Sequence, residues 1–311
     1  MNCNPLQTTL QSPRHSIQLK NPIVPASGTF GNGSIVHSLY DINQLGAVLT
    51  KSITVEPRSG NPSPRIYETP SGLLNSVGLE NKGLPWFLEE VQPFLLSLET
   101  SKWVSIAGFT IEEFETLAHV MDTLPIDALE VNVSCPNIHA NGVQFCQNMA
   151  VLEETLRRVR KATHHFLIAK IALETNPLSQ ALDIIEQENF DAVCIGNTIR
   201  GIAIDAETRK PFFHKIFAGL SGPAIKPIAL RVVWEAYDSH PTLPIIGCGG
   251  IQCASDVIEF LAAGATSVEV GTLNLVDPFI LPRLIQDLET YCCTHQIDLP
   301  NTIGSAHHSL R

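Results

Sequence analysis

The sequence is poor in basic residues. Its 311 residues include 20 Lys and Arg against 31 Asp and Glu, which gives a formal net charge of -11 at pH 7. A protein that follows a nucleic-acid backbone needs a basic stripe to meet the phosphates. We therefore expect no nucleic-acid partner.

Long apolar runs are also missing. No stretch approaches the roughly 18 uninterrupted apolar residues of a membrane helix, and the first twenty residues lack the apolar core of a secretory signal. Eight cysteines in a long chain without such a signal are typical of reduced thiols rather than a disulfide framework. The spacing of Cys292, Cys293 and His295 matches no closed zinc site. We expect a cytoplasmic protein with neither a membrane segment nor a metal.

What is present is apolar sequence in short pieces. The chain is 44% hydrophobic and only 16% charged, which excludes a disordered chain. Eight apolar runs alternate with segments of helical spacing, an arrangement typical of a (β/α)8 barrel. We expect strands at 22–25, 47–51, 103–107, 128–133, 166–171, 192–195, 244–247 and 267–271. We expect helices at 112–122, 150–163, 179–189, 229–237, 254–263 and 278–291, with less regular crossovers within 34–45 and 85–98. No domain boundary is visible, so residues 1–311 are expected to form one domain.

Two strand-to-helix connections, 52–83 and 199–226, are much longer than the usual 2–6 residues. Both are rich in Gly and Pro and both follow the carboxyl end of a predicted strand. Active sites of such barrels are built at that end, so we expect the two connections to form walls of a site rather than plain surface loops.

Polar residues at the strand ends indicate what this site binds. Along the strand at 128–133 and the residue after it, Glu130, Asn132 and Ser134 alternate with apolar residues, which predicts a polar lumen. Lys51 and Lys170 end apolar strands, and because lysine is seldom buried without a partner, they indicate an anionic ligand. Glycines follow the last two strands, where barrels often bind phosphate. Cys135, just after a strand and before Pro136, is the most reactive-looking cysteine.

Seven motifs together resemble the dihydroorotate dehydrogenases of class 1. In chain order they read NPIVPASGTFG, TKSITVEPRSGNPSPR, SGLLNSVGLENKG, VNVSCPN, GLSGPAIKP, IIGCGGI and VEVGTLNLVDP. The resemblance extends from about residue 21 to residue 287. It implies an FMN-binding (β/α)8 barrel that oxidises dihydroorotate to orotate in pyrimidine synthesis.

The resemblance also implies roles for individual residues. Cys135 matches the base that removes a proton from C5 of the substrate while hydride leaves C6. The residues that match substrate contacts are Lys51, Asn75, Ser76, Val77, Gly78, Leu79, Asn132, Asn137, Asn197 and Thr198. Those that match FMN contacts are Ser27, Lys51, Ser52, Asn132, Lys170, Gly196, Gly222, Gly249, Gly250, Gly271 and Thr272, with Lys170 at the N1 edge of the flavin.

Within class 1, the segment SGLLNSVGLENKG is more similar to the NAD-linked subclass than to the fumarate-linked one. That subclass pairs a homodimeric FMN subunit with a second protein that carries FAD and a 2Fe–2S cluster. This sequence contains no cluster motif and no Rossmann fingerprint, so it implies use of NAD only through such a partner.

Some positions depart from the family pattern. Ser105 stands where the family usually has a flavin-contacting asparagine, and Gly196 replaces a bulkier apolar residue. Three alternatives remain open at this point: a dihydropyrimidine dehydrogenase-like enzyme, whose motif reads C-P-H rather than Cys135-Pro136-Asn137; a catalytically silent FMN-binding paralogue; and a dihydrouridine synthase, which the acidic composition disfavours.

Overall fold

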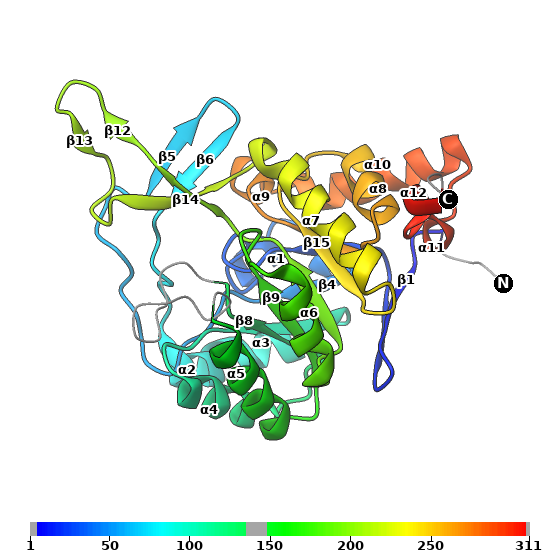
Figure 1. The fold of residues 1–311 in the computed structure, drawn as a ribbon, viewed down its shortest axis with the longest axis horizontal. Coiled ribbons are helices and arrows are strands. Elements are labelled where there is room, and N and C mark those ends of the chain that lie inside the picture. The colour runs from blue at the N-terminus through cyan, green and yellow to red at the C-terminus, as the bar shows by residue number, and fades with distance from the viewer. Residues whose placement is uncertain (1–4, 135–147, 309–311) are drawn as a thin grey trace.

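The computed structural model describes residues 5–134 and 148–308 and contains an eight-stranded parallel barrel (Figure 1). The strands are neighbours in the order β3, β16, β15, β10, β9, β8, β7, β4. The backbone N–H of Gly46, just before β4, donates to the carbonyl of Ile23 in β3 at 3.0 Å, so the first and last strands of this order also meet. The barrel strands are β3 (Ile23–Pro25), β4 (Ala47–Leu49), β7 (Ser101–Ile106), β8 (Ala128–Asn132), β9 (Phe166–Ile171), β10 (Ala192–Ile195), β15 (Ile245–Cys248) and β16 (Ser267–Val270).

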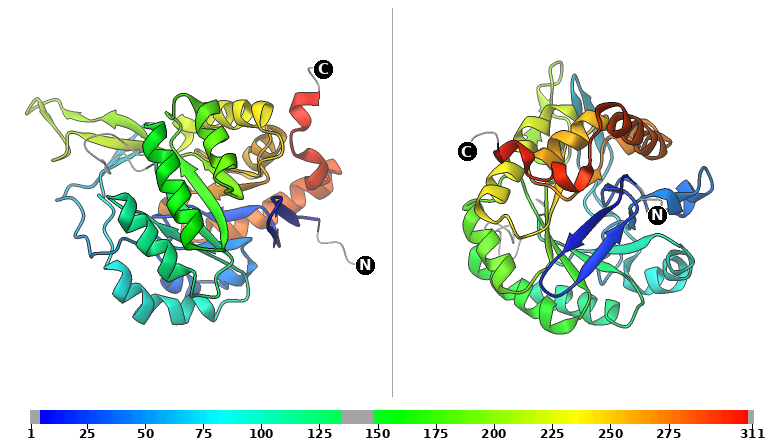
Figure 2. Two further views of the ribbon diagram at one scale, coloured as in Figure 1. Left: turned by 60° about the horizontal axis from the view of Figure 1, so that its bottom comes forward. Right: turned by 90° about the vertical axis from the view of Figure 1, so that its right-hand side faces the viewer.

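Helices surround the barrel, as the sequence predicts (Figure 2). Their buried positions recur with helical spacing, as in α4, where Phe114, Leu117, Ala118 and Met121 face the strands. The regular helices are α4 (Ile111–Met121), α5 (Met149–Ala162), α6 (Leu178–Gln187), α7 (Lys226–Ser239), α8 (Ala254–Ala262) and α10 (Ile280–His295). Short helices complete the ring and the C-terminal end: α9 (Leu273–Val276), α11 (Leu299–Thr302), α12 (Ser305–His308) and the 3-10 turn η4 (Pro223–Ile225). No helix in the described ranges is long and apolar enough to cross a membrane.

The two crossovers with weak helical patterns are broken helices. The first consists of α1 (Ser34–His37) and the 3-10 turn η1 (Ile42–Gln44). The second runs from α2 (Gly83–Trp86) through one π-helical turn, η2 (Phe87–Val91), into α3 (Gln92–Leu96). Pro93 lies near the start of α3, where its missing N–H is tolerated, and the wider turn precedes it.

The two long connections are joined into one antiparallel sheet above the barrel. The first contributes β5 (Ile66–Thr69) and β6 (Gly72–Asn75), and the second contributes β11 (Ile199–Ile202) and β14 (Phe217–Ser221), in the order β11, β14, β6, β5. Leu74 of β6 lies opposite Leu220 of β14. A small hairpin of β12 (Ile204–Asp205) and β13 (Lys210–Pro211) extends beyond this sheet (Figure 1).

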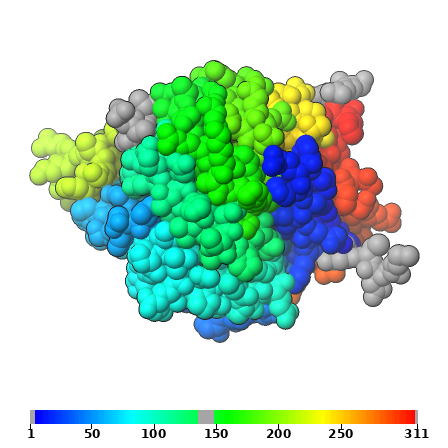
Figure 3. All heavy atoms as spheres, turned by 90° about the horizontal axis from the view of Figure 1, so that it is seen from below, coloured from blue at the N-terminus to red at the C-terminus, as the bar shows by residue number. Residues whose placement is uncertain are grey.

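The other end of the barrel is closed by an N-terminal hairpin that the sequence analysis did not predict. It consists of β1 (Thr8–Gln11) and β2 (Ser16–Leu19) and packs against the barrel body (Figure 3). Leu10 and Leu19 of the hairpin are fully buried and share one apolar cluster with lumen residues such as Trp103 and Ile168. The lumen is therefore filled at this end by described residues, and the cavity at its other end faces the sheet of the long connections.

Candidate active site

A cavity of about 280 Å³ lies at the carboxyl ends of the barrel strands, between them and the overlying sheet. This volume is close to that of a small-molecule site. It is lined by nearly all the described residues that the sequence analysis assigned to cofactor or substrate: Ser27, Lys51, Ser52, Asn75, Val77, Gly78, Leu79, Asn132, Lys170, Gly196, Asn197, Thr198, Gly222, Gly249, Gly250, Gly271 and Thr272. Residues from seven of the eight strand ends, all but that of β7, and from both long connections are thus brought to one place.

A chain of hydrogen bonds orients the polar side chains across one side of the cavity. The Ser105 and Ser52 hydroxyls are 2.8 Å apart, and Asn132 Nδ2 donates to Ser52 Oγ at 3.2 Å. The Ser134 hydroxyl donates to Asn132 Oδ1 at 2.8 Å, and Asn197 Nδ2 donates to Ser134 Oγ at 2.7 Å. Each amide is therefore fixed with a known direction of its donor and acceptor atoms.

Two residues of this hydrogen-bonded series have a position or a role that differs from the sequence-based expectation. Ser105 does not line the cavity but lies fully buried behind Ser52, so it supports a cavity residue instead of contacting a ligand. Ser134 orients both Asn132 and Asn197, a role that the sequence analysis missed. The alternation of β8 predicted that Ser134 faces the lumen with Asn132, but not that its hydroxyl bonds to both amides.

The segment after β6 forms the upper wall. Asn75 Nδ2 donates to the carbonyl of Gly219 in β14 at 3.3 Å, which ties this wall to the second long connection. Ser76 was predicted to contact substrate, but it is buried outside the cavity lining and its hydroxyl accepts from Asn61 Nδ2 at 3.0 Å. Alternation along the extended chain turns Ser76 away while Asn75 and Val77 face the cavity.

Lys51 is half-buried in the cavity wall. Burial lowers the pKa of its ammonium below the usual value, and the negative charge of Glu80 offsets part of this effect. A partly desolvated cation in such a place favours an anionic ligand.

Lys170 forms the deepest charged point of the cavity lining. It is 3% exposed, and its Nζ lies 2.5 Å from Glu269 Oε2 and 3.3 Å from Glu130 Oε2. Burial alone would lower the pKa of Lys170, but its interactions with the two neighbouring carboxyl groups outweigh that effect, so the pKa is raised well above its usual value. The lysine therefore stays cationic at the bottom of the cavity.

Glycine turns line the side formed by β10, β15 and β16. Gly196 has a φ of 138°, and a Cβ at this position would lie 1.8 Å from the carbonyl oxygen of Cys248. This backbone conformation therefore requires glycine at position 196, where the family usually has a bulkier apolar residue. Gly250 has a φ of 76°, and its Cβ would lie 2.7 Å from the backbone nitrogen of Lys226, at the start of α7.

These residues fit a phosphorylated flavin. One end of the cavity is lined mainly by glycines, whose backbone a phosphate can approach closely. The residues there are Gly222, Gly249, Gly250, Gly271 and Thr272. The Lys170 ammonium supplies a fixed positive charge at the barrel axis. Cys135 and Asn137, the predicted base and a predicted substrate contact, lie outside the described residues.

Comparison with known proteins supports this interpretation. The family model described as "Dihydroorotate dehydrogenase" matches residues 9–291. A protein from a Thermoanaerobacter species named "Dihydroorotate dehydrogenase B (NAD(+)), catalytic subunit" is 44% identical over 290 residues, which cover 93% of this chain and 96% of that protein. Proteins of the same name are 42% identical from Desulforamulus reducens, over 94% of this chain and 96% of theirs, and 41% identical from Parabacteroides distasonis, over 90% and 92%. The chain belongs to the dihydroorotate dehydrogenase family.

Proposed function

We propose that this protein oxidises dihydroorotate to orotate in de novo pyrimidine (UMP) biosynthesis, with residues 1–311 acting as one FMN-binding domain. The observation that carries the proposal is the convergence of Lys51, Asn75, Asn132 and Asn197 on one cavity with Lys170 beneath them. Orotate is planar and carries a carboxylate and alternating amide donors and acceptors. A lysine and three oriented asparagines complement that pattern.

Bound FMN supplies the acceptor for the hydride that leaves C6 of the substrate. Cys135 acts as the base: its thiolate takes the proton from C5, so that the C5–H and C6–H bonds break and the ring double bond forms. A thiol with an ordinary pKa of about 8.5 is mostly protonated at neutral pH, so activity should rise with pH. Lys51 holds the substrate carboxylate, and the Asn132 and Asn197 amides hold the ring.

We further propose that the electrons leave through a partner subunit with FAD and a 2Fe–2S cluster, and that the FMN subunit forms a homodimer. The relatives' name, which includes both NAD(+) and "catalytic subunit", supports a partner. We place the protein in the cytoplasm. The five described cysteines are all free, which suits a reducing compartment.

The first test is the visible spectrum of the purified protein before and after anaerobic addition of dihydroorotate. We expect a flavin spectrum that dihydroorotate bleaches and dihydrouracil does not. Bleaching by dihydrouracil alone would support the dihydropyrimidine alternative, and an unbleached flavin would support a silent paralogue. A protein that binds no FMN after reconstitution would refute the proposal.

The partner needs a separate test. The isolated chain should pass electrons from dihydroorotate to an artificial dye but not to NAD+. Direct reduction of NAD+ by the isolated chain would remove the need for a second subunit.

A further inference from the structure

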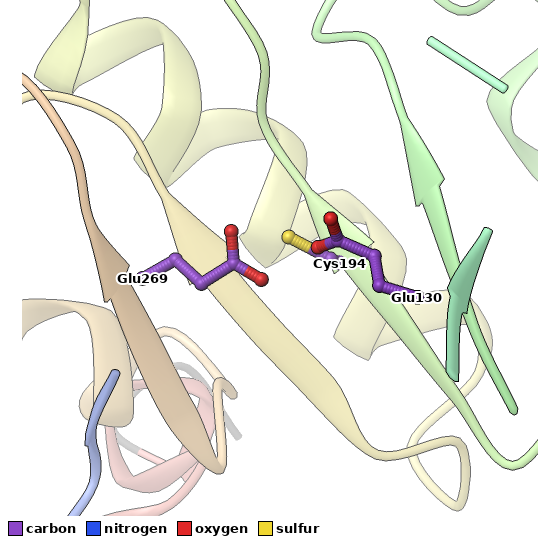
Figure 4. Close-up of side chains that lie close together, drawn as sticks. All are labelled: Glu130, Cys194 and Glu269. Carbon is purple, nitrogen blue, oxygen red and sulfur yellow. The ribbon is translucent and has the colours of Figure 1, made fainter. Parts of the chain in front are cut away.

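Three charged side chains from three strands meet in the lumen just below the cavity. Glu130 of β8, Lys170 of β9 and Glu269 of β16 are here called the lumen triad. Both glutamates are fully buried, and neither lines the cavity itself. Figure 4 shows Glu130 and Glu269 extending toward each other from opposite sides of the lumen, with Cys194 of β10 between them.

The triad contains more acceptors than donors. Both carboxylate oxygens of Glu130 and Oε1 of Glu269 are buried and lack a hydrogen bond of good geometry within the described ranges, although Lys170 Nζ lies 3.3 Å from Glu130 Oε2 and the hydroxyls of Ser27 and Ser105 lie nearby. Leaving a buried carboxylate oxygen without a donor is costly. A single proton on one carboxyl group would supply the missing donor, because the two side chains are close enough to hydrogen-bond to each other.

The neighbouring groups do not supply a compensating charge. The polar groups that face the triad from the other strands and strand ends are the hydroxyls of Ser27 and Ser105 and the thiols of Cys194 and Cys248. Burial raises the pKa of the Cys194 thiol well above its usual value, so this thiol stays neutral. The pKa of the Cys248 thiol is lowered, first by its hydrogen bond with Cys194. Ionisation of Cys248 would add a further negative charge, so it cannot stabilise a second carboxylate.

The proton has a preferred position. Burial and the adjacent charge of Glu130 raise the pKa of Glu269 well above its usual value. For Glu130, burial acts in the same direction and is the largest single effect, but the Lys170 ammonium together with hydrogen bonds from Glu269, Ser105 and Ser27 outweighs it, so the pKa is lowered. Two carboxyl groups that share a buried site cannot both ionise readily, so their environments separate them into an acid and a carboxylate.

A metal ion is a poorer explanation of the same geometry. Ligand atoms of Glu130, Cys194 and Glu269 lie within 4.8 Å of one another, as a metal site would require. Lys170 Nζ, however, already contacts both carboxyl groups and provides the positive charge that a cation would bring.

We propose that Glu269 is a positioning residue that remains a neutral carboxylic acid and, together with ionised Glu130, holds the Lys170 ammonium against the floor of the cavity. The triad then has no net charge. Its ammonium faces the cofactor and stabilises negative charge on the reduced flavin, a consequence that rests on the proposed function. Loss of the Glu269 proton would give the triad a net negative charge and disfavour that reduced state.

Infrared spectroscopy of the protein without cofactor tests the proton directly. We expect a carboxylic-acid C=O stretching band at pH 7 that shifts in D2O, is lost in Glu269→Gln and persists in the control Glu289→Gln, which alters an exposed glutamate. Absence of the band from the wild-type protein would overturn the proposal without any variant. A band that is lost in Glu130→Gln but persists in Glu269→Gln would overturn the assignment to Glu269.

The flavin midpoint potential provides a second readout. Glutamine mimics a neutral acid, so Glu269→Gln should keep the wild-type potential at pH 7. As pH rises through the titration of Glu269, the wild-type potential should fall below that of the variant. A wild-type potential that already lies below that of Glu269→Gln at pH 7 would mean that Glu269 is ionised there and would refute the proposal. Failure to bind FMN would refute the proposed function but would leave the infrared test valid.

Discussion

Substitution of Gly196 by alanine tests whether the glycine turns shape the cofactor end of the cavity. Gly196 has a φ of 138°, where an L-residue is strained by roughly 1–3 kcal/mol. The added Cβ would also lie 1.8 Å from the Cys248 carbonyl oxygen, whereas contacts below 3.0 Å are essentially never observed. One of the two strands must therefore move, at a cost of about 1–3 kcal/mol for overpacking. We expect Gly196→Ala to lose roughly 2–6 kcal/mol of unfolding free energy.

The same displacement should weaken cofactor binding. Cys248 is followed directly by Gly249 and Gly250, so a shift of its carbonyl moves the predicted phosphate site. We expect at least about a tenfold increase in the Kd for FMN, equivalent to about 1.4 kcal/mol. Urea denaturation of the protein without cofactor measures the first effect, and quenching of flavin fluorescence measures the second.

Gly31→Ala is the matched control. Gly31 also has a positive φ, 59°, but a Cβ there would have no atom within 4 Å, so it reports backbone strain alone. We expect a loss of about 1–2 kcal/mol and unchanged FMN binding. If Gly196→Ala is no more destabilised than Gly31→Ala and binds FMN as tightly as the wild-type protein, the steric argument is wrong.

Three further predictions concern catalysis and stability. Cys135→Ala should keep FMN and orotate binding but slow flavin reduction by about 10²–10⁴-fold in stopped-flow measurements; an unchanged rate would remove Cys135 from the mechanism. The KM for dihydroorotate should rise as pH increases through the lowered pKa of Lys51, because only the ammonium binds the carboxylate, and Lys51→Met should abolish this dependence. If the variant keeps the wild-type KM profile, another group binds the carboxylate. Leu10→Ala, in the fully buried hairpin, should cost about 2–5 kcal/mol in urea denaturation, against less than about 0.5 for the 81% exposed Ile35→Ala; equal losses would contradict the role of the hairpin as a plug.

The barrel could be predicted from the sequence because each of its strands is a short apolar run that needs no distant residue to be recognised. The residues that line the cavity could be anticipated because strand ends of a parallel barrel meet at one face. The hairpin of β1 and β2 could not be predicted from the sequence. Leu10 and Leu19 alternate with exposed residues over only four positions per strand, and their burial depends on a lumen that other segments build.

The lumen triad shows a second limit of prediction from the sequence. The alternation of β8 predicted that Glu130 faces the lumen. That Glu269, 139 positions later in the chain, approaches the same lysine depends on strand register, with Glu269 opposite Cys248 and Lys170 opposite Cys194. The position of the Ser76 side chain was missed for a related reason, because a motif assigns a whole segment to substrate while the extended backbone turns alternate side chains away from the cavity.

The pairing of β6 with β14 has a consequence for how this enzyme can diversify. The two walls of the site come from different parts of the chain, yet Asn75 lies opposite Gly219 in a hydrogen-bonded ladder. A one-residue slip of register turns every side chain of a strand to its other face. An insertion or deletion within either strand would therefore rotate Asn75 out of the cavity unless the other wall changed in step, so these two segments are expected to vary in length only outside the paired residues.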